Sequence, residues 1–300
     1  MRFAAIDVGS NAARLLLSQV IENGGSPVFK KESLIRYPLR LGDDSFLLRR
    51  ITPEKSGELV KILKAFRYLM EAYRPISSRA CATSALREAE NRAEIIRAVR
   101  DESRIDLEVI DGRTEAQIIT QNHVERNLDP NSSYLYIDVG GGSTQLSFFE
   151  GKTCLESRSF NIGAIRLLRN VVSPASWKDM KKWLKQKARD LTSIAAIGSG
   201  GNINKIFMLA GKKLGQPLSL KKMRTISRLL KRFDTEERIR VLGLRPDRAD
   251  VIVPALDISL RVMKWAGIDH VYVPFIGLSD GLIHMLYEEH KRVPGSNPAS

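Results

Sequence analysis

Short apolar runs alternate with amphipathic stretches along the whole chain. The short runs predict strands, and the stretches in which apolar residues recur every three or four positions predict helices. The predicted strands are 3–7, 14–20, 79–83, 107–110, 134–139, 144–149, 194–197 and 270–275. The predicted helices are 51–73, one from Asn91, one from about Thr114, 173–191, 202–209, 220–233, 247–265 and 279–290. Strands that alternate with helices in this way indicate an α/β fold.

Several of the predicted helices carry local signals at their ends or along one face. Thr52 can cap the helix that follows it, and Pro53 suits a first helical turn. Asn91 followed by Glu94 predicts a capping box, and Pro254 predicts a kink in the helix 247–265. The predicted core face of the helix 220–233 consists of Leu220, Met223, Ile226, Leu229 and Phe233.

An internal repeat sets the domain organisation. The segment 6–11, Ile-Asp-Val-Gly-Ser-Asn, recurs at 137–144 as Ile-Asp-Val-Gly-Gly-Gly-Ser-Thr. Each copy is a strand that ends in Asp, then a turn of small residues, then a second strand. The repeat predicts two tandem α/β domains, at 1–126 and 127–279, joined near 126–132 by a segment of linker-like composition. We expect a C-terminal helix, 280–295, to pack back on the first domain, and 292–300 to form a flexible tail.

The 300 residues carry 48 Lys and Arg against 34 Asp and Glu, which gives a formal net charge of +14. Such a field attracts a partner with dense negative charge. Cys81 and Cys154 cannot make a disulfide scaffold and fit a reducing compartment, so we expect a cytoplasmic protein. The four histidines lack metal-ligand spacing, which argues against a zinc enzyme. No targeting signal and no membrane span is expected.

The two Asp-turn motifs are the first candidates for chemistry. A turn rich in Gly and Ser directs several backbone N–H groups at one point, where they can bind an anion. Asp7 and Asp138, at the ends of the preceding strands, would hold Mg²⁺ or a metal-bound water. For an isolated copy, an ordinary glycine hairpin with a capping Asp would be the favoured interpretation, and the repetition favours the functional one. The candidate phosphate-binding residues of the turns are Gly9, Ser10, Asn11, Gly140, Gly141, Gly142, Ser143 and Thr144.

Three further segments add candidates, each with a simpler alternative. The loop Gly198, Ser199, Gly200 and Gly201 runs from a strand into a helix start, which suits phosphate but is also a common connection. Thr83, Ser84 and Arg87 can donate hydrogen bonds to phosphate, or can cap a helix. Glu115, in the first turn of a helix, either complements the helix dipole or activates an attacking water.

These motifs, taken in order, resemble the exopolyphosphatase/guanosine pentaphosphate phosphatase (Ppx/GppA) family of the actin-like ATPase superfamily. The resemblance runs through 7–11, 82–87, 112–116, 137–144, 162–166, 198–201 and 248–252. It implies two actin-like (RNase H-like) domains with an active-site cleft between them. It also implies Mg²⁺-assisted hydrolysis of a terminal phosphoryl group of polyphosphate or guanosine pentaphosphate, and a homodimer. Within the motifs, Glu115 matches the catalytic glutamate, Asp138 a metal- and water-orienting aspartate, and Arg166 falls in a phosphate-site segment.

Some positions depart from the family pattern. Gln145 stands where the family usually has Glu, which removes one carboxylate that helps to hold metal. The other departures are Ala12 for Ser, Thr114 for Glu and Asn202 for Thr. Gln145 motivates an alternative, a non-catalytic sensor that binds polyphosphate or guanosine pentaphosphate without turnover.

Two basic helices bear on the class of substrate. Lys178, Lys181, Lys182, Lys185 and Lys187 lie in one, and Lys221, Lys222, Arg224, Arg228, Lys231 and Arg232 lie in the other. They form either solvated helix faces or a track that guides a long polyanion. A small-molecule kinase and a nucleic-acid binder are disfavoured, because no nucleotide or acceptor motif and no aromatic-basic alternation is present.

Overall fold

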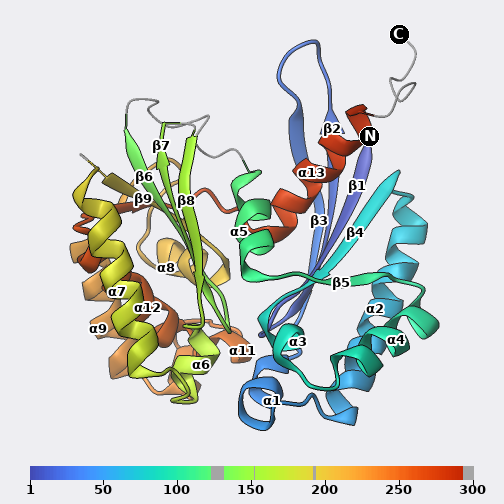
Figure 1. Cartoon of the computed structure of the whole chain (residues 1–300), viewed down its shortest axis with the longest axis horizontal. Helices are drawn as coiled ribbons and strands as arrows, with labels where there is room; N and C mark the ends of the chain where they lie inside the picture. Colours follow the sequence, from blue (N-terminus) through green and yellow to red (C-terminus); the bar gives the residue numbers. More distant parts are fainter. Residues whose placement is uncertain (123–131, 152, 192–193, 293–300) are drawn as a thin grey trace. The chain divides into compact units, whose positions relative to one another are not determined.

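The computed structural model describes residues 1–122, 132–151, 153–191 and 194–292. Its contacts divide the chain into two units, and Figure 1 shows a sheet with helices in each. Unit 1 contains residues up to Asn122 together with the segment from Leu278, and unit 2 contains His123–Gly277. The predicted linker residues 126–131 and the tail residues 293–300 lie outside the described residues.

Unit 1 is built on a five-stranded sheet with the strand order β3-β2-β1-β4-β5. Its strands are β1 (Arg2–Val8), β2 (Ala13–Ile21), β3 (Val28–Tyr37), β4 (Ser77–Ala82) and β5 (Leu107–Val109). The first three pair antiparallel, and β4 and β5 continue the sheet in parallel. Its helices are α1 (Leu41–Leu48), α2 (Pro53–Tyr73), α3 (Ser84–Glu88), α4 (Arg92–Ser103), α5 (Gly112–Thr120) and α13 (Leu278–Arg292).

Alternating side chains of β1 bury against helices on opposite faces of this sheet, as the strand period requires. Ile6 belongs to a core cluster with Leu63 and Phe66 of α2. Phe3 packs against Tyr287 of α13 with ring centroids 6.3 Å apart. Helix α13 also contacts α5, the helix that carries Glu115 (Figure 1).

Unit 2 is built on a six-stranded sheet with the strand order β10-β11-β9-β6-β7-β8. Its strands are β6 (Ser133–Val139), β7 (Thr144–Glu150), β8 (Thr153–Phe160), β9 (Ile194–Ser199), β10 (Leu218–Ser219) and β11 (His270–Tyr272). Its helices are α6 (Ala164–Leu168), α7 (Pro174–Arg189), α8 (Gly201–Leu209), α9 (Leu220–Arg232), α10 (Thr235–Arg240), α11 (Pro246–Ala249) and α12 (Ile252–Ala266). Helix α12 lies at the centre of the helical layer, in contact with α7, α8 and α9.

The two sheets share one topology, which the repeated sequence motif predicts. In each, three antiparallel strands in chain order are followed by two strands that add in parallel beyond the first strand, and in unit 2 the short β10 pairs antiparallel at the outer edge. Asp7 is the penultimate residue of β1, and Asp138 is the penultimate residue of β6. The two aspartates therefore occupy equivalent positions in the two units.

The structure corrects several local predictions. Asn91 makes no capping bond, because its side chain pairs with the backbone of Ile51 instead. The predicted helix 247–265 is two helices, α11 and α12. Pro254 sits in the first turn of α12, where a missing N–H breaks no intrahelical hydrogen bond. In α9, Leu230 is buried whereas Leu229 is 43% exposed.

Candidate functional site

The turn between β1 and β2 is held by hydrogen bonds from the backbone at the start of α1. The N–H of Gly9 donates to the carbonyl oxygen of Ala12 at 3.0 Å, which closes the turn. The N–H of Gly42 donates to the carbonyl oxygen of Ser10 at 2.9 Å, and that of Arg40 donates to Asn11 at 3.1 Å. The carbonyl groups of this turn are therefore committed to the start of α1, which fixes the direction of the turn.

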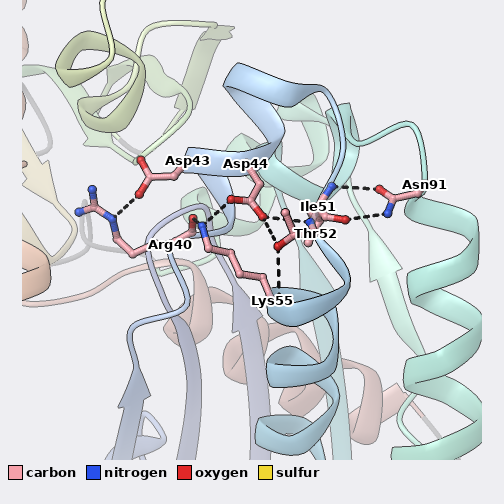
Figure 2. Close-up of polar contacts among 7 residues, drawn as sticks. All are labelled: Arg40, Asp43, Asp44, Ile51, Thr52, Lys55 and Asn91. Carbon is pink, nitrogen blue, oxygen red and sulfur yellow. Dashed lines mark hydrogen bonds and ion pairs between the residues drawn. The ribbon is translucent and has the colours of Figure 1, made fainter.

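A buried polar network fixes the start of α1 in turn (Figure 2). Asp44 accepts hydrogen bonds from Lys55 Nζ at 2.7 Å, from Thr52 Oγ1 at 2.7 Å and from the Thr52 N–H at 2.9 Å. Lys55 Nζ also donates to the carbonyl oxygen of Arg40 at 3.0 Å. Burial opposes ionisation of Asp44, but the hydrogen bonds from Lys55 and Thr52 outweigh it and lower the pKa of the carboxyl group.

The segment after β4 joins the same turn. The N–H of Thr83 donates to the carbonyl oxygen of Val8 at 3.1 Å, so the end of β4 continues the pairing with β1. The hydroxyl groups of Ser10 and Ser84 lie 2.9 Å apart and are both buried. The structure thus brings together, within unit 1, the predicted Ser10, Thr83 and Ser84.

Glu115 and Arg87 are neighbours at the next strand end. The N-cap Asp111 accepts a hydrogen bond from the N–H of Thr114 at 2.7 Å, which starts α5 and places Glu115 in its first turn. A carboxylate oxygen of Glu115 lies 3.7 Å from Arg87 Nη1, and this Nη1 donates to the carbonyl oxygen of Ile110 at 2.8 Å. Glu115 is only 8% exposed, so a carboxylate and a guanidinium face each other in a partly desolvated place.

Helix α13 determines where α5 lies. Gly281 of α13 approaches Ile118 of α5 so closely that a Cβ at position 281 would overlap the carbonyl oxygen of Ile118. Because only glycine allows this approach, the C-terminal helix holds the helix that carries Glu115.

Asp7 is an ion-pair partner in the structure. It is 3% exposed, and its Oδ2 lies 2.5 Å from Nη1 of Arg14, the residue directly opposite it on β2. In unit 2 the residue opposite Asp138 on β7 is Gln145. Neither copy of the repeat therefore places a second carboxylate opposite its aspartate.

The glycine turn of unit 2 is supported by α6. The N–H of Gly140 donates to the carbonyl oxygen of Ser143 at 2.9 Å, and the N–H groups of Ala164 and Ile165 donate to Gly140 and Gly141. Arg166 is buried, and its Nε donates to the carbonyl oxygen of Gly142 at 2.6 Å. As in unit 1, the carbonyl groups of the turn accept hydrogen bonds from the start of a following helix, which here is α6. The N–H groups of the turn other than that of Gly140 are the ones that could bind an anion.

Two side chains beside this turn have supporting contacts. Thr144 is fully buried, and its hydroxyl donates to the carbonyl oxygen of Ile162 at 2.5 Å. Gln145 is buried too, and its amide donates to the Ser143 hydroxyl at 2.9 Å. Gln145 therefore orients Ser143 through a donor that glutamate would lack.

The loop 198–201 meets Asp138. The Ser199 hydroxyl lies within hydrogen-bond distance of two acceptors, Asp138 Oδ2 at 2.9 Å and the carbonyl oxygen of Ile276 at 3.0 Å. Gly200 has φ 96°, and a Cβ there would lie 3.0 Å from Asp138 Oδ1. Glycine is thus required at 200, both for its backbone conformation and for the nearness of the carboxylate. Helix α8 then begins at Gly201, which directs its first N–H groups toward the same loop.

The residues present fit a magnesium ion unequally. Mg²⁺ is commonly held by one or two carboxylates together with substrate phosphates. Asp138, with an orienting hydroxyl from Ser199, fits this role. Asp7 fits it poorly because a guanidinium already faces its Oδ2. Within the described part of the chain, no group of three or more His, Cys, Asp or Glu side chains could hold a metal ion.

Two cations near the candidate site are not among the residues that the sequence motifs predict for it. Arg14 begins the predicted strand 14–20, and its position opposite Asp7 follows from the hairpin register. Arg248 is separated from the loop 198–201 by 47 positions or more, yet its guanidinium lies 2.8 Å from where a Cβ of Gly201 would stand. The family motif at 248–252 was the available signal for Arg248.

Comparison with known proteins places this geometry in a family. The sequence model of the Ppx/GppA phosphatase family matches residues 33–290. A bifunctional 3-dehydroquinate synthase/phosphatase of Fusobacterium nucleatum is 27% identical over 304 residues, which covers 90% of this chain and 44% of that protein. Exopolyphosphatase 1 of Mycobacterium tuberculosis is 25% identical over 305 residues, covering 94% of this chain and 87% of that protein. The chain thus spans less than half of the first relative and most of the second.

Solved structures bear on the fold. An exopolyphosphatase of Cytophaga hutchinsonii has a TM-score of 0.83 at 23% identity, with 96% of this chain and 98% of that chain covered. A Ppx/GppA protein of Aquifex aeolicus has a TM-score of 0.76 at 24% identity, with 98% and 99% covered. The predicted fold class, α/β with two actin-like domains, is confirmed. No helix in the described residues is long and apolar enough to cross a membrane. From the match over residues 33–290, the chain belongs to the Ppx/GppA phosphatase family.

Proposed function

We propose that this protein hydrolyses the terminal phosphoryl group of inorganic polyphosphate, with water as the acceptor. Family membership and the exopolyphosphatase relatives support the class of substrate. The observation that carries the proposal is Glu115, a buried carboxylate in a first helical turn, 3.7 Å from the anchored guanidinium of Arg87. A base and an anion-binding cation held next to each other are what in-line attack on a phosphoryl group requires.

In the proposed reaction, Glu115 accepts a proton from a water molecule and orients its oxygen toward the terminal phosphorus. A new P–O bond forms to this oxygen, and the bridging P–O bond to the rest of the chain breaks. The products are orthophosphate and a chain one phosphate shorter. Phosphoryl transfer asks the protein chiefly for positioning and charge neutralisation, so no covalent intermediate is needed.

Charge neutralisation is assigned to cations and backbone dipoles. Arg87 donates to oxygens of the terminal phosphoryl group, and the N–H groups of the turns after Asp7 and Asp138 bind phosphate oxygens. Asp138 and Ser199 would hold Mg²⁺, which supplies positive charge to the phosphate oxygens when bound. Asp7, paired with Arg14, is assigned to orienting the β1–β2 turn, although its place at a strand end before a small-residue turn predicts a magnesium ligand.

Two alternatives rest on specific observations. Guanosine pentaphosphate presents the same terminal phosphoryl chemistry, and the sequence motifs resemble those of a family whose members act on either compound. A sensor that binds polyphosphate without turnover is motivated by Gln145, which gives Asp138 an amide rather than a carboxylate as its opposite neighbour. Glu115 and its pairing with Arg87 favour turnover over sensing.

One assay separates these possibilities. The purified chain is offered polyphosphate and guanosine pentaphosphate, each with and without Mg²⁺, and free orthophosphate is measured. The proposal predicts release from polyphosphate that Mg²⁺ stimulates. Binding of polyphosphate without any release would favour the sensor, and release from guanosine pentaphosphate alone would reassign the substrate.

A further inference from the structure

The positive charge of the protein is concentrated in unit 2. Residues 123–277 contain 26 Lys and Arg against 14 Asp and Glu, which accounts for +12 of the formal net charge of +14. Within this unit, residues 174–232 contain 15 Lys and Arg and only 2 Asp and Glu. This segment includes α7 and α9, so the charge follows two helices rather than the loops of the candidate site.

Each of these helices carries its exposed cations in a row. On α7, exposed Lys and Arg recur at intervals of three or four residues along one side, and the same holds for α9. This spacing places consecutive charges on adjacent turns of one helix face, roughly 5–6 Å apart. We call these residues the basic face: Lys178, Lys182, Lys185 and Arg189 on α7, and Lys221, Arg224, Arg228 and Arg232 on α9.

The cations of the basic face are not neutralised by the protein. Among the described residues, none of the eight has a carboxylate partner, whereas the neighbouring Lys187 and Lys231 pair with Glu156 and Asp257. Helix α9 contains no acidic residue. Like charges three and four positions apart on a helix repel each other and destabilise it slightly. A bound polyanion would relieve this repulsion.

The two rows belong to one helical layer. Helices α7 and α9 both pack against α12, as Figure 1 also shows. Helix α7 contacts α12 through Trp177 and Trp265, whose ring centroids are 5.9 Å apart. Helix α9 contacts α12 through the ion pair of Lys231 with Asp257 at 2.8 Å. Arg261 and Lys264 of α12 are exposed as well, so the element between the rows adds positive charge.

The aromatic residues near the basic face disfavour nucleic acid as the partner. Proteins that bind single strands stack bases on exposed aromatic rings. The guanidinium of Arg261 covers the Trp177 ring at 4.5 Å from its centroid, and Trp183 is buried. Neither tryptophan of α7 is thus free to stack on a base, and the rows of cations suit a chain of phosphates without bases.

We propose that the basic face binds the body of a long polyphosphate chain, at a place distinct from the loops that bind its reacting end. The identity of this ligand rests on the proposed function, but binding itself does not require turnover. The predicted consequence is that affinity rises with chain length, because a chain that reaches the basic face gains contacts that a short one lacks.

The test compares binding with turnover in two variants of equal charge. One replaces four cations of α9, as Lys221→Gln, Arg224→Gln, Arg228→Gln and Arg232→Gln. The matched control replaces four exposed cations of unit 1, as Arg50→Gln, Lys61→Gln, Arg74→Gln and Arg97→Gln. Binding of long-chain polyphosphate is titrated without divalent cations, and phosphate release is measured separately with tripolyphosphate as substrate.

We expect the α9 variant to bind long-chain polyphosphate on the order of tenfold to a hundredfold more weakly than the parent protein at about 0.1 M salt. The slope of the logarithm of the binding constant against the logarithm of the salt concentration should be less steep by about 3. The control should bind nearly as the parent protein does, and release from tripolyphosphate should be unchanged in both. Equal binding by the α9 variant and the parent would overturn the inference. Tighter binding of single-stranded DNA than of polyphosphate would assign the face to nucleic acid instead. Length-dependent binding without any phosphate release would leave the inference standing while refuting the proposed function.

Discussion

Nη1 of Arg87 lies 3.7 Å from a carboxylate oxygen of Glu115 and at the same time donates to the carbonyl oxygen of Ile110 at 2.8 Å. The backbone just before α5 therefore fixes the guanidinium, and the guanidinium in turn faces the proposed base. An anchored cation needs little reorganisation when negative charge develops nearby, which is where preorganised electrostatics contribute most.

Replacing Arg87 should therefore impair turnover more than folding. Arg87→Met should lower kcat for phosphate release by about 10²–10³-fold. Arg87→Lys should restore only part of it, because an ammonium lacks the planar fork of donors. Steady-state phosphate release gives kcat and KM, and Arg97→Met on the exposed side of α4 serves as the control. A kcat for Arg87→Met equal to that of the control would remove Arg87 from the proposed mechanism.

Asp44 should link stability to pH. Its pKa is lowered in the folded protein, so the ionised form favours folding; this contribution is present above the unfolded value of about 3.9 and is lost as pH falls through the folded pKa. Asp44→Asn should reduce the free energy of unfolding by roughly 1–3 kcal/mol at neutral pH, because Lys55 loses its charged partner. It should also flatten the loss of stability below pH about 4.

Urea unfolding from pH 3 to pH 7 measures both effects of Asp44→Asn. Glu54→Gln, in the exposed first turn of α2, is the control and should follow the parent curve. Because the network holds Arg40, whose N–H supports the turn at Asn11, Asp44→Asn should also raise KM for polyphosphate. An unaltered pH profile together with an unaltered KM would show that the network does not support the turn.

Gln145 offers a test of metal dependence. It lies directly opposite Asp138 across β6 and β7, so Gln145→Glu would place two carboxylates on neighbouring strands. Two carboxylates bind Mg²⁺ better than one, and we expect the Mg²⁺ concentration for half-maximal phosphate release to fall several-fold. Gln145→Met removes the amide bonds to Ser143 and Ser159 without adding a carboxylate, so it should not lower this concentration. If Gln145→Glu needs the same or a higher Mg²⁺ concentration for half-maximal phosphate release, this result would argue against Asp138 as a magnesium ligand.

The two cysteines should differ in reactivity. Cys81 is fully buried in β4, and burial together with the nearby charge of Glu108 raises the pKa of its thiol to about 12. Cys154 is exposed on β8. In the folded protein, iodoacetamide at pH 8 should modify Cys154 and leave Cys81 unmodified, and urea should expose both. Mass spectrometry of the peptides measures this, and rapid labelling of Cys81 in the native protein would contradict its placement in the sheet.

The parts of the fold that could be predicted from sequence are those with local signals. The strand–turn–strand units after Asp7 and Asp138 are short-range features, and their repetition revealed the duplicated topology. The edge strands β3 and β8 were missed because charged residues such as Lys30, Lys31 and Glu156 interrupt the apolar pattern that marks a strand. Helix α1 was also missed, since it begins after Arg40 in a left-handed conformation and has no side-chain cap.

Partners that are distant in the sequence explain the other differences between the predicted and the observed contacts of the candidate site. Asn91 carries a capping signature, yet Ile51, 40 positions away, takes both of its side-chain bonds. Arg14 and Gln145 acquire their roles from strand register, which a composition pattern does not reveal. Arg166 supports the turn through the carbonyl oxygen of Gly142, a contact that its motif position alone does not indicate.

The most direct test of the proposed mechanism is phosphate release by Glu115→Gln, with Glu94→Gln, in the exposed first turn of α4, as the matched control. Both variants are assayed for orthophosphate release from polyphosphate and for binding of the same substrate. We predict that Glu115→Gln binds polyphosphate as the parent does but releases phosphate at least about 10²-fold more slowly, because the proton acceptor is gone. Release by Glu115→Gln at the rate of Glu94→Gln would contradict the assignment of Glu115 as the base.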